Sequence, residues 1–187
     1  MKVSHEAPVP YMRQVRGLID YDYCLPHLLD ENEMYKAHFL KAKKDGRYII
    51  MDNSLHELGK AYDFDRLIYW VNELEPDEFM VPDVWMKCAE TAAQAKYWKQ
   101  FEFPEKTQKI AVIQGEDKNQ AYLCANLLYD LGYKKLCVSY GATWYNDFFP
   151  HNNPDMGKPV VFDTITYKPQ STILEESQQL KFALTLE

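Results

Sequence analysis

Three apolar segments of this chain end on a polar residue at equal intervals. The segment YIIMD ends at Asp52, EFMVPD ends at Asp83 and KIAVIQ ends at Gln114, so that 31 residues separate each polar residue from the next. Short apolar runs that recur at this period, with longer amphipathic stretches between them, are typical of repeated βαβ units. This spacing constrains the fold more than any other feature of the sequence.

The stretches between the apolar runs have helical periodicity. Residues 64–75 and 88–101 fill two of the intervals, and residues 117–133 continue the pattern up to Gly132, a residue that commonly ends helices. Residues 30–46 form a further expected helix, with acids in the first turn and lysines in the last. Apolar spacing predicts the buried faces of two of these helices: Leu67, Ile68, Val71 and Leu74 in one, and Tyr122, Ala125, Leu128 and Leu131 in the other. We expect further strands at residues 135–141 and 20–29, although Pro26 lies inside the latter.

Strands that are apolar on both faces and alternate with helices indicate an α/β fold with a parallel sheet. The two main architectures are an open doubly wound sheet and a (β/α) barrel. The 31-residue unit favours the barrel, because eight units of this length make a chain of about 250 residues. With 187 residues, six or seven strands are expected, so we predict a barrel-like sheet that is short or incomplete.

The chain is expected to form a single domain over residues 1–187. Its hydrophobic fraction is 47%, and no Gly/Ser-rich or Pro-rich linker divides it. We place the core at about residues 20–167 and a helical C-terminal tail at residues 171–187. The tail has helical spacing at Ile173, Leu174, Leu180 and Leu184, which favours packing on the core over packing on a partner chain.

The formal net charge of −7 argues against nucleic-acid binding through a generally basic surface. Residues 11–16 and 41–47 are candidates for a local basic patch, although solvated helix ends and loops have the same composition. The four cysteines form no CxxC pair, and no apolar run is long enough to cross a membrane. We therefore expect a cytoplasmic protein with reduced cysteines, and no membrane partner.

The polar residues at the strand ends are the candidate site. Because the carboxyl ends of parallel strands meet at one edge of a sheet, Asp52, Asp83 and Gln114 should converge there. Asn53, Ser54, Ser139 and Tyr140 should lie nearby. Asp and Asn also cap helices and form turns, but capping does not require two acids and an amide in the same phase. Two carboxylates and a carboxamide suit a flat polar heterocycle, because they can accept hydrogen bonds from its N–H groups.

Other site types have less support in the sequence. No GxGxxG or GxxxxGK[ST] motif follows a strand, so no nucleotide cofactor is expected. The five histidines show no HExxH spacing, and His56 and Glu57 are expected near the mouth of the site. Asp52, His56 and Glu57 are the one set of candidate metal ligands, and the sequence favours a site without metal.

The segments MDNSLHELG, VPDVWMKCAET and IAVIQG resemble, in this order and spacing, the tRNA-guanine transglycosylase superfamily. The resemblance is closer to phage and bacterial members that place 7-deazaguanines into DNA. It covers roughly residues 47–142, and it implies a transferase of the pentosyltransferase type that uses no cofactor. It also implies a location in the cytoplasm, which is the host cytoplasm if the chain is phage-encoded.

The resemblance implies roles for individual residues. Asp52 matches an acid with a general acid/base role, and Asp83 matches the acid that reads the Watson–Crick edge of the base. Gln114 and Gly115 match the Gln-Gly of the base pocket. Ser139, Tyr140 and Gly141 fall where the family has a glycine-containing strand exit. Asn53 and Ser54 belong to the motif of the first acid.

The chain departs from the family in two respects. The family's covalent nucleophile is an aspartate on a later strand, and only Asp163 in VVFDTITYKP matches it, after a connection shorter than the family has. The cysteine-rich zinc motif of the tRNA-acting members is absent, which favours DNA over tRNA as the substrate.

Three functions remain open at the level of sequence. The first is exchange of guanine for a 7-deazaguanine in nucleic acid, with Asp52 and Asp163 as catalytic residues. The second is a non-catalytic, barrel-derived module that retains the base pocket or binds a protein. The third is an unrelated (β/α) enzyme that acts on a small polar metabolite. A second copy of the chain, or another protein, is a candidate partner to complete the barrel.

Overall fold

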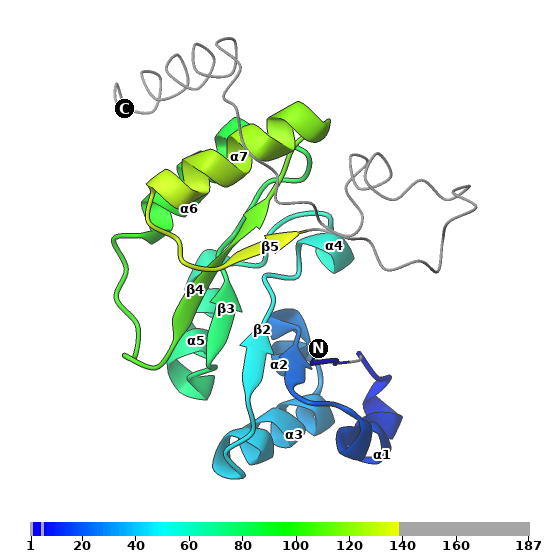
Figure 1. Cartoon of the computed structure of the whole chain (residues 1–187). Coiled ribbons are helices and arrows are strands. Elements are labelled where there is room, and N and C mark those ends of the chain that lie inside the picture. The colour runs from blue at the N-terminus through cyan, green and yellow to red at the C-terminus, as the bar shows by residue number, and fades with distance from the viewer. Residues whose placement is uncertain (1, 5, 139–187) are drawn as a thin grey trace, which may run out of the picture.

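A computed structural model of the chain describes residues 2–4 and 6–138. Within these residues the fold is α/β, with a parallel sheet of five strands flanked by helices (Figure 1). The strands are β1 (Asp22–Cys24), β2 (Ile49–Met51), β3 (Glu78–Met80), β4 (Gln108–Ile113) and β5 (Leu136–Val138). The predicted parallel α/β class is therefore confirmed. The candidate nucleophile Asp163 and the expected tail at residues 171–187 lie outside the described residues.

The strands lie in the sheet in the order in which they occur along the chain. Each of the four neighbouring pairs, from β1–β2 to β4–β5, is parallel. The connections contain α2 (Pro26–Glu31) and α3 (Glu33–Lys44) after β1, α4 (Leu55–Leu58) and α5 (Phe64–Leu74) after β2, α6 (Cys88–Trp98) after β3, and α7 (Lys118–Asp130) after β4. No reversal of strand order occurs among the five described strands.

The main core lies between the helices and one face of the sheet. Since successive side chains of a strand point to opposite faces, Cys24, Met51, Phe79 and Ala111 all point to this side. They form one cluster with buried residues of α3, α5, α6 and α7, such as Phe39, Leu67, Trp98 and Leu127. All four long helices therefore contribute to a core on the same side of the sheet.

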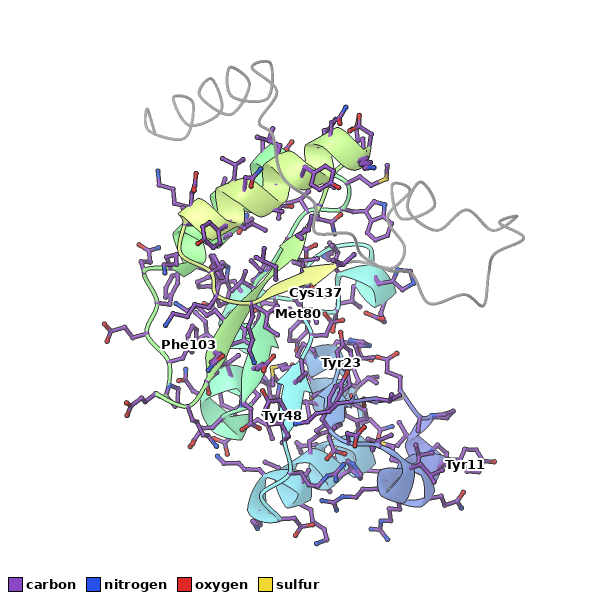
Figure 2. The ribbon with its side chains drawn as sticks, viewed as in Figure 1. Tyr11, Tyr23, Tyr48, Met80, Phe103 and Cys137 are labelled. Carbon is purple, nitrogen blue, oxygen red and sulfur yellow. The ribbon has the colours of Figure 1, made fainter. Side chains whose placement is uncertain are left out.

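The opposite face of the sheet carries a second, smaller cluster. Met80, Ile110 and Val112 are buried there, with Tyr23, Ile50 and Cys137 packed around them. The hydroxyl of Tyr23 donates to the sulfur of Met80, 3.6 Å away. Figure 2 shows Tyr23, Met80 and Cys137, which come from β1, β3 and β5, in the same part of the sheet. Both faces of the sheet are thus apolar, as the continuous apolar strands predict.

Side-chain caps fix where three of the helices begin. The Asn32 side chain accepts from the backbone N–H groups of Met34 and Tyr35 at the start of α3, each at 3.0 Å. Asp63 and Asp117 cap α5 and α7 in the same manner, accepting from backbone N–H groups three residues further on. Such caps pair N–H groups that have no partner inside the helix.

Two details of the sequence interpretation were wrong. In residues 20–29 only Asp22–Cys24 is a strand, because Pro26 begins helix α2, where the missing N–H costs nothing. Of the predicted face of α7, Leu128 is buried, but Tyr122, Ala125 and Leu131 are only partly so. Ala121, Cys124 and Leu127 are buried instead. In α5, Leu67, Val71 and Leu74 are buried as predicted, together with Trp70, and the predicted Ile68 is only partly buried.

The N-terminal segment lies beside β1, at one edge of the described sheet. It contains η1 (Val9–Tyr11), α1 (Met12–Val15) and η2 (Arg16–Leu18). The backbone N–H of Val3 donates to the Asp20 carboxylate at 2.7 Å, and the Ser4 hydroxyl donates to the Tyr21 carbonyl at 2.7 Å. In the part of the chain that the structure describes, no helix is sufficiently long and apolar to span a membrane.

Candidate functional site

A cleft of about 410 Å³ lies where β2, β3 and β4 end. It is lined by acids (Glu6, Asp52, Glu57 and Asp83), by amides and an imidazole (Asn53, Gln114 and His56), and by apolar and aromatic side chains that include Tyr23, Met80 and Trp85. The predicted convergence of Asp52, Asp83 and Gln114 is therefore observed. His56 and Glu57 also line the cleft, as expected from their position after Asp52.

Asp83 lies at the centre of a buried hydrogen-bond network. Its Oδ1 accepts from Nδ2 of Asn53 and its Oδ2 from Nε2 of Gln114, each at 2.6 Å. Asp83, Asn53 and Gln114 are 4%, 2% and 1% exposed, so water has little access to compete for these hydrogen bonds. The pKa of Asp83 is raised, because burial has a larger effect than the hydrogen bonds from Asn53 and Gln114, which lower it. One amide N–H group thus occupies each carboxylate oxygen.

Backbone contacts fix the two amides. Nδ2 of Asn53 also donates to the carbonyl of Val81 at 3.0 Å, and its Oδ1 accepts from the backbone N–H of Leu55 at 3.0 Å. Gln114 Oε1 accepts from the backbone N–H of Met86 at 2.9 Å. These contacts determine which atom of each amide faces Asp83, because the oxygen is already used as an acceptor. The carboxylate is therefore held in a defined orientation by three consecutive strand exits.

Asp52 is the second acid of the cleft, and its environment differs from that of Asp83. Burial raises its pKa to about 6, with further raising contributions from the nearby charges of Glu57, Asp83 and Glu6, against a backbone hydrogen bond from Asn53. A carboxyl group with this pKa changes its protonation state close to neutral pH, as a general acid or base must. The cleft thus contains one acid that two amides orient, Asp83, and a second, Asp52, whose pKa of about 6 lies close to neutral pH.

Two aromatic side chains meet at the edge of the cleft. The rings of His56 and Trp85 have centroids 6.2 Å apart at an interplanar angle of 44°. Trp85 is 36% exposed, and it precedes Met86, whose φ is +56°. Gln114 bonds both the backbone of Met86, which follows Trp85, and Asp83, two residues before it, so one amide fixes the chain before and after Trp85.

Two predicted site residues have structural contacts instead of lining the cleft. Ser54 is fully buried in the left-handed conformation, and its Oγ lies 2.8 Å from Nδ1 of His27. Gly115 packs so closely on α7 that a Cβ there would lie 2.7 Å from the backbone nitrogen of Ala121. Ser139, Tyr140, Gly141 and the predicted nucleophile Asp163 lie outside the described residues. The roles proposed for all six remain predictions.

The sequence interpretation missed three features of the cleft. Glu6 enters from the N-terminal segment, for which no periodic pattern predicted a position, and burial and the Glu57 charge raise its pKa. Trp85 was signalled only by its place two residues after a strand-end acid. The thiol of Cys124, in α7, accepts from the backbone N–H of Gln114 at 3.3 Å. Its sequence spacing gave no sign of this contact.

Residues 2–4 and 6–138 contain no group of three or more His, Cys, Asp or Glu side chains arranged to hold a metal ion. No protein-family model and no curated protein matches the chain significantly.

Proposed function

We propose that this protein exchanges guanine for a 7-deazaguanine base in nucleic acid, DNA in preference to tRNA, and that the base binds in the cleft between Asp52, Asp83 and Gln114. The observation that carries the proposal is the pairing of Asp83 with Asn53 and Gln114. A carboxylate has about four lone-pair positions, and the two amides use one on each oxygen. The backbone N–H of Asp83 also bonds this carboxylate, and the acceptor capacity that remains suits an edge of N–H donors, such as N1–H and the 2-amino group of a guanine-type base.

Asp52 is the proposed proton carrier of the reaction. Guanine leaves with an electron pair on N9, so a proton must be delivered to it, and the incoming 7-deazaguanine must lose the corresponding proton. A carboxyl group with a pKa of about 6 can do both near neutral pH. In the proposed sequence, the Asp163 carboxylate attacks C1′ as guanine departs, and the 7-deazaguanine nitrogen then attacks C1′ and releases Asp163.

The strand order supports the barrel-like architecture that this function requires. An open doubly wound sheet reverses its order at a switch point, whereas a barrel continues in one direction. The order β1-β2-β3-β4-β5 and the helical core on a single face favour a curved segment of a barrel. In the proposal, the cluster around Met80 and Val112 forms part of its interior, and a second copy or another chain is a candidate to complete it.

Calorimetric titration with free 7-deazaguanine tests the base pocket. Asp83→Ala should weaken binding at least about 100-fold, because two N–H groups of the base would lose a charged acceptor. Asp65→Ala, which removes an exposed aspartate from the first turn of α5, is the matched control and should bind as wild type. Unchanged binding by a folded Asp83→Ala variant contradicts the pocket assignment.

The second candidate function is a non-catalytic module that retains the pocket. It is favoured by the fact that Asn53, Asp83 and Gln114 already pair with one another, as a purely structural network would. Trapping a covalent adduct between the protein and a guanine-containing oligonucleotide separates the two functions. An adduct with wild type and none with Asp163→Asn supports exchange, whereas base binding with no adduct supports the module.

A further inference from the structure

The two basic stretches of the sequence meet along one groove of the structure. Arg13 and Arg16 come from α1 and η2, Lys41 comes from α3, and all three line a hollow of about 660 Å³ between these segments. Figure 1 shows α1 lying beside α3, near the β1–β2 edge of the five-stranded sheet. The charges gather here in a chain whose net charge is −7.

One carboxylate organises part of this basic rim. Asp45 lies 2.9 Å from Nη2 of Arg16 and 2.9 Å from Nζ of Lys41. A single negative charge is therefore set against three positive ones, and the rim keeps a net positive charge. The Lys41 side chain is 65% exposed, and Arg13 is also exposed, so both can reach a ligand.

The floor of the groove is apolar. Val9, Pro10, Met12 and Ala37 line it, and Met34, which also lines it, is 61% exposed. Tyr11 is 55% exposed between these lining residues, and Figure 2 shows its side chain pointing away from the body of the protein. Tyr11 is not one of the lining residues. A cationic rim above an apolar floor suits a single nucleic-acid strand, whose phosphates meet cations while its bases lie on apolar groups.

Shared lining residues link this groove to the candidate base-binding cleft. The groove shares Met12 and His38 with a smaller cavity of about 250 Å³, and that cavity shares Glu6 and Tyr23 with the cleft. The three hollows thus form a series along the N-terminal segment.

We propose that the groove between α1 and α3, which we call the Arg13–Lys41 groove, binds the phosphate backbone of a single-stranded stretch of the nucleic-acid substrate. The choice of nucleic acid over an acidic polypeptide rests on the proposed function. The positive rim and apolar floor stand independently of it.

Fluorescence anisotropy with a fluorescein-labelled 16-nucleotide oligodeoxythymidylate tests this proposal. The double variant Arg13→Glu/Lys41→Glu should bind at least about tenfold more weakly near 100 mM salt. It should also reduce the slope of log Kd against log salt concentration by about 1.4, since each phosphate contact contributes about 0.7 for a single strand. Lys44→Glu/Lys134→Glu changes the net charge equally, at exposed positions outside the groove, and should bind as wild type.

Equal affinity and equal salt slope for the two double variants would overturn the proposal. It would also be overturned if the groove variant lost binding to labelled polyglutamate while its oligonucleotide binding stayed unchanged, since an acidic polypeptide would then be the partner. Thermal unfolding of both double variants shows whether they are folded. As a smaller change, Arg13→Gln alone should reduce the salt slope by about 0.7 if the double variant is unstable.

Failure of the groove and failure of the base-exchange function give different results. Asp83→Ala should lose the free base but keep the oligonucleotide affinity of wild type. If wild type binds no 7-deazaguanine while the groove variants behave as expected, the base-exchange function fails and the groove stands. If base binding depends on Asp83 while the groove and control variants do not differ, the groove alone fails.

Discussion

The side-chain amide of Gln114 lies 2.6 Å from the carboxylate of Asp83, and the two residues follow neighbouring strands of a parallel sheet. Gln114 is 1% exposed, and its oxygen accepts from the backbone of Met86. One side chain therefore fixes an acid and the loop that carries Trp85. Each of these contacts has a measurable consequence.

Replacing Gln114 by Met should destabilise the protein by about 2 to 4 kcal/mol. Methionine fills a similar volume but leaves Oδ2 of Asp83 and the N–H of Met86 without their partners, and an unpaired buried polar group costs about 1 to 3 kcal/mol. Urea unfolding measures the loss. Gln100→Met, at an exposed position, is the control and should change stability by less than about 0.5 kcal/mol. A Gln114→Met variant as stable as the control would show that the network contributes nothing to folding.

Gly115→Ala should also destabilise the fold, for a steric reason. The added methyl group would lie 2.7 Å from the nitrogen of Ala121 and 2.9 Å from the carbonyl carbon of Gln120, so α7 must shift away from the end of β4. We expect a loss of about 1 to 3 kcal/mol in urea unfolding, the usual cost of overpacking. At Gly17 a Cβ would meet nothing within 4 Å, which makes Gly17→Ala the matched control. Similar stability of the two variants would contradict the close approach.

Asp52 should make stability depend on pH between about 4 and 7. Its pKa is about 6 in the folded protein, against an ordinary value of 3.8 for a solvated aspartate, so the folded form binds the proton more tightly than the unfolded chain does. The associated stability is fully present below pH 4 and is lost as the pH rises through 6, up to about 2 to 3 kcal/mol. Asp52→Asn should therefore be more stable than wild type at pH 7.5 and no more stable at pH 4. Urea unfolding across this range, with Asp65→Asn as control, measures the difference, and a pH-independent difference would exclude the raised pKa.

Binding of a planar base should quench the fluorescence of Trp85. Trp70 and Trp98 are 4% and 0% exposed and belong to the main core, whereas Trp85 lines the cleft. A base that stacks near Trp85 should reduce emission in wild type and reduce it much less in Trp85→Phe, which keeps an apolar ring. Titration with 7-deazaguanine gives both curves. Equal quenching in wild type and Trp85→Phe would mean that the base does not lie near this side chain.

The repeat in the sequence was sufficient to predict the parallel sheet and the convergence of Asp52, Asp83 and Gln114. In a parallel sheet the carboxyl ends of all strands lie at one edge. Residues that end successive strands, here 31 positions apart, therefore lie close together. The pairing of Asp83 with two amides could not be predicted in this manner. It depends on side-chain directions in the loops after the strands, which no periodic pattern specifies.

The errors have similarly local causes. In a sequence, Pro26 can interrupt a strand or begin a helix. Residues Pro26, His27 and Leu29 are buried in α2, and the sequence pattern does not indicate this packing. In α7, apolar residues occupy more than one helical face, so periodicity alone did not identify the buried one. The face with Cys124, Leu127 and Leu128 packs in the main core, and α7 also contacts α6.

The strand order of the sheet has a consequence for how the chain folds. Every strand in the described residues pairs only with strands adjacent to it in sequence, so no pairing has to wait for a distant segment. Each βαβ unit can complete its hydrogen bonds as soon as its second strand has been synthesised, and the growing edge then becomes the template for the next unit. We therefore expect the sheet to assemble during translation from β1 toward β5. A defect in β5 should leave the earlier strands paired, whereas a defect in β2 should interrupt the sheet at its start.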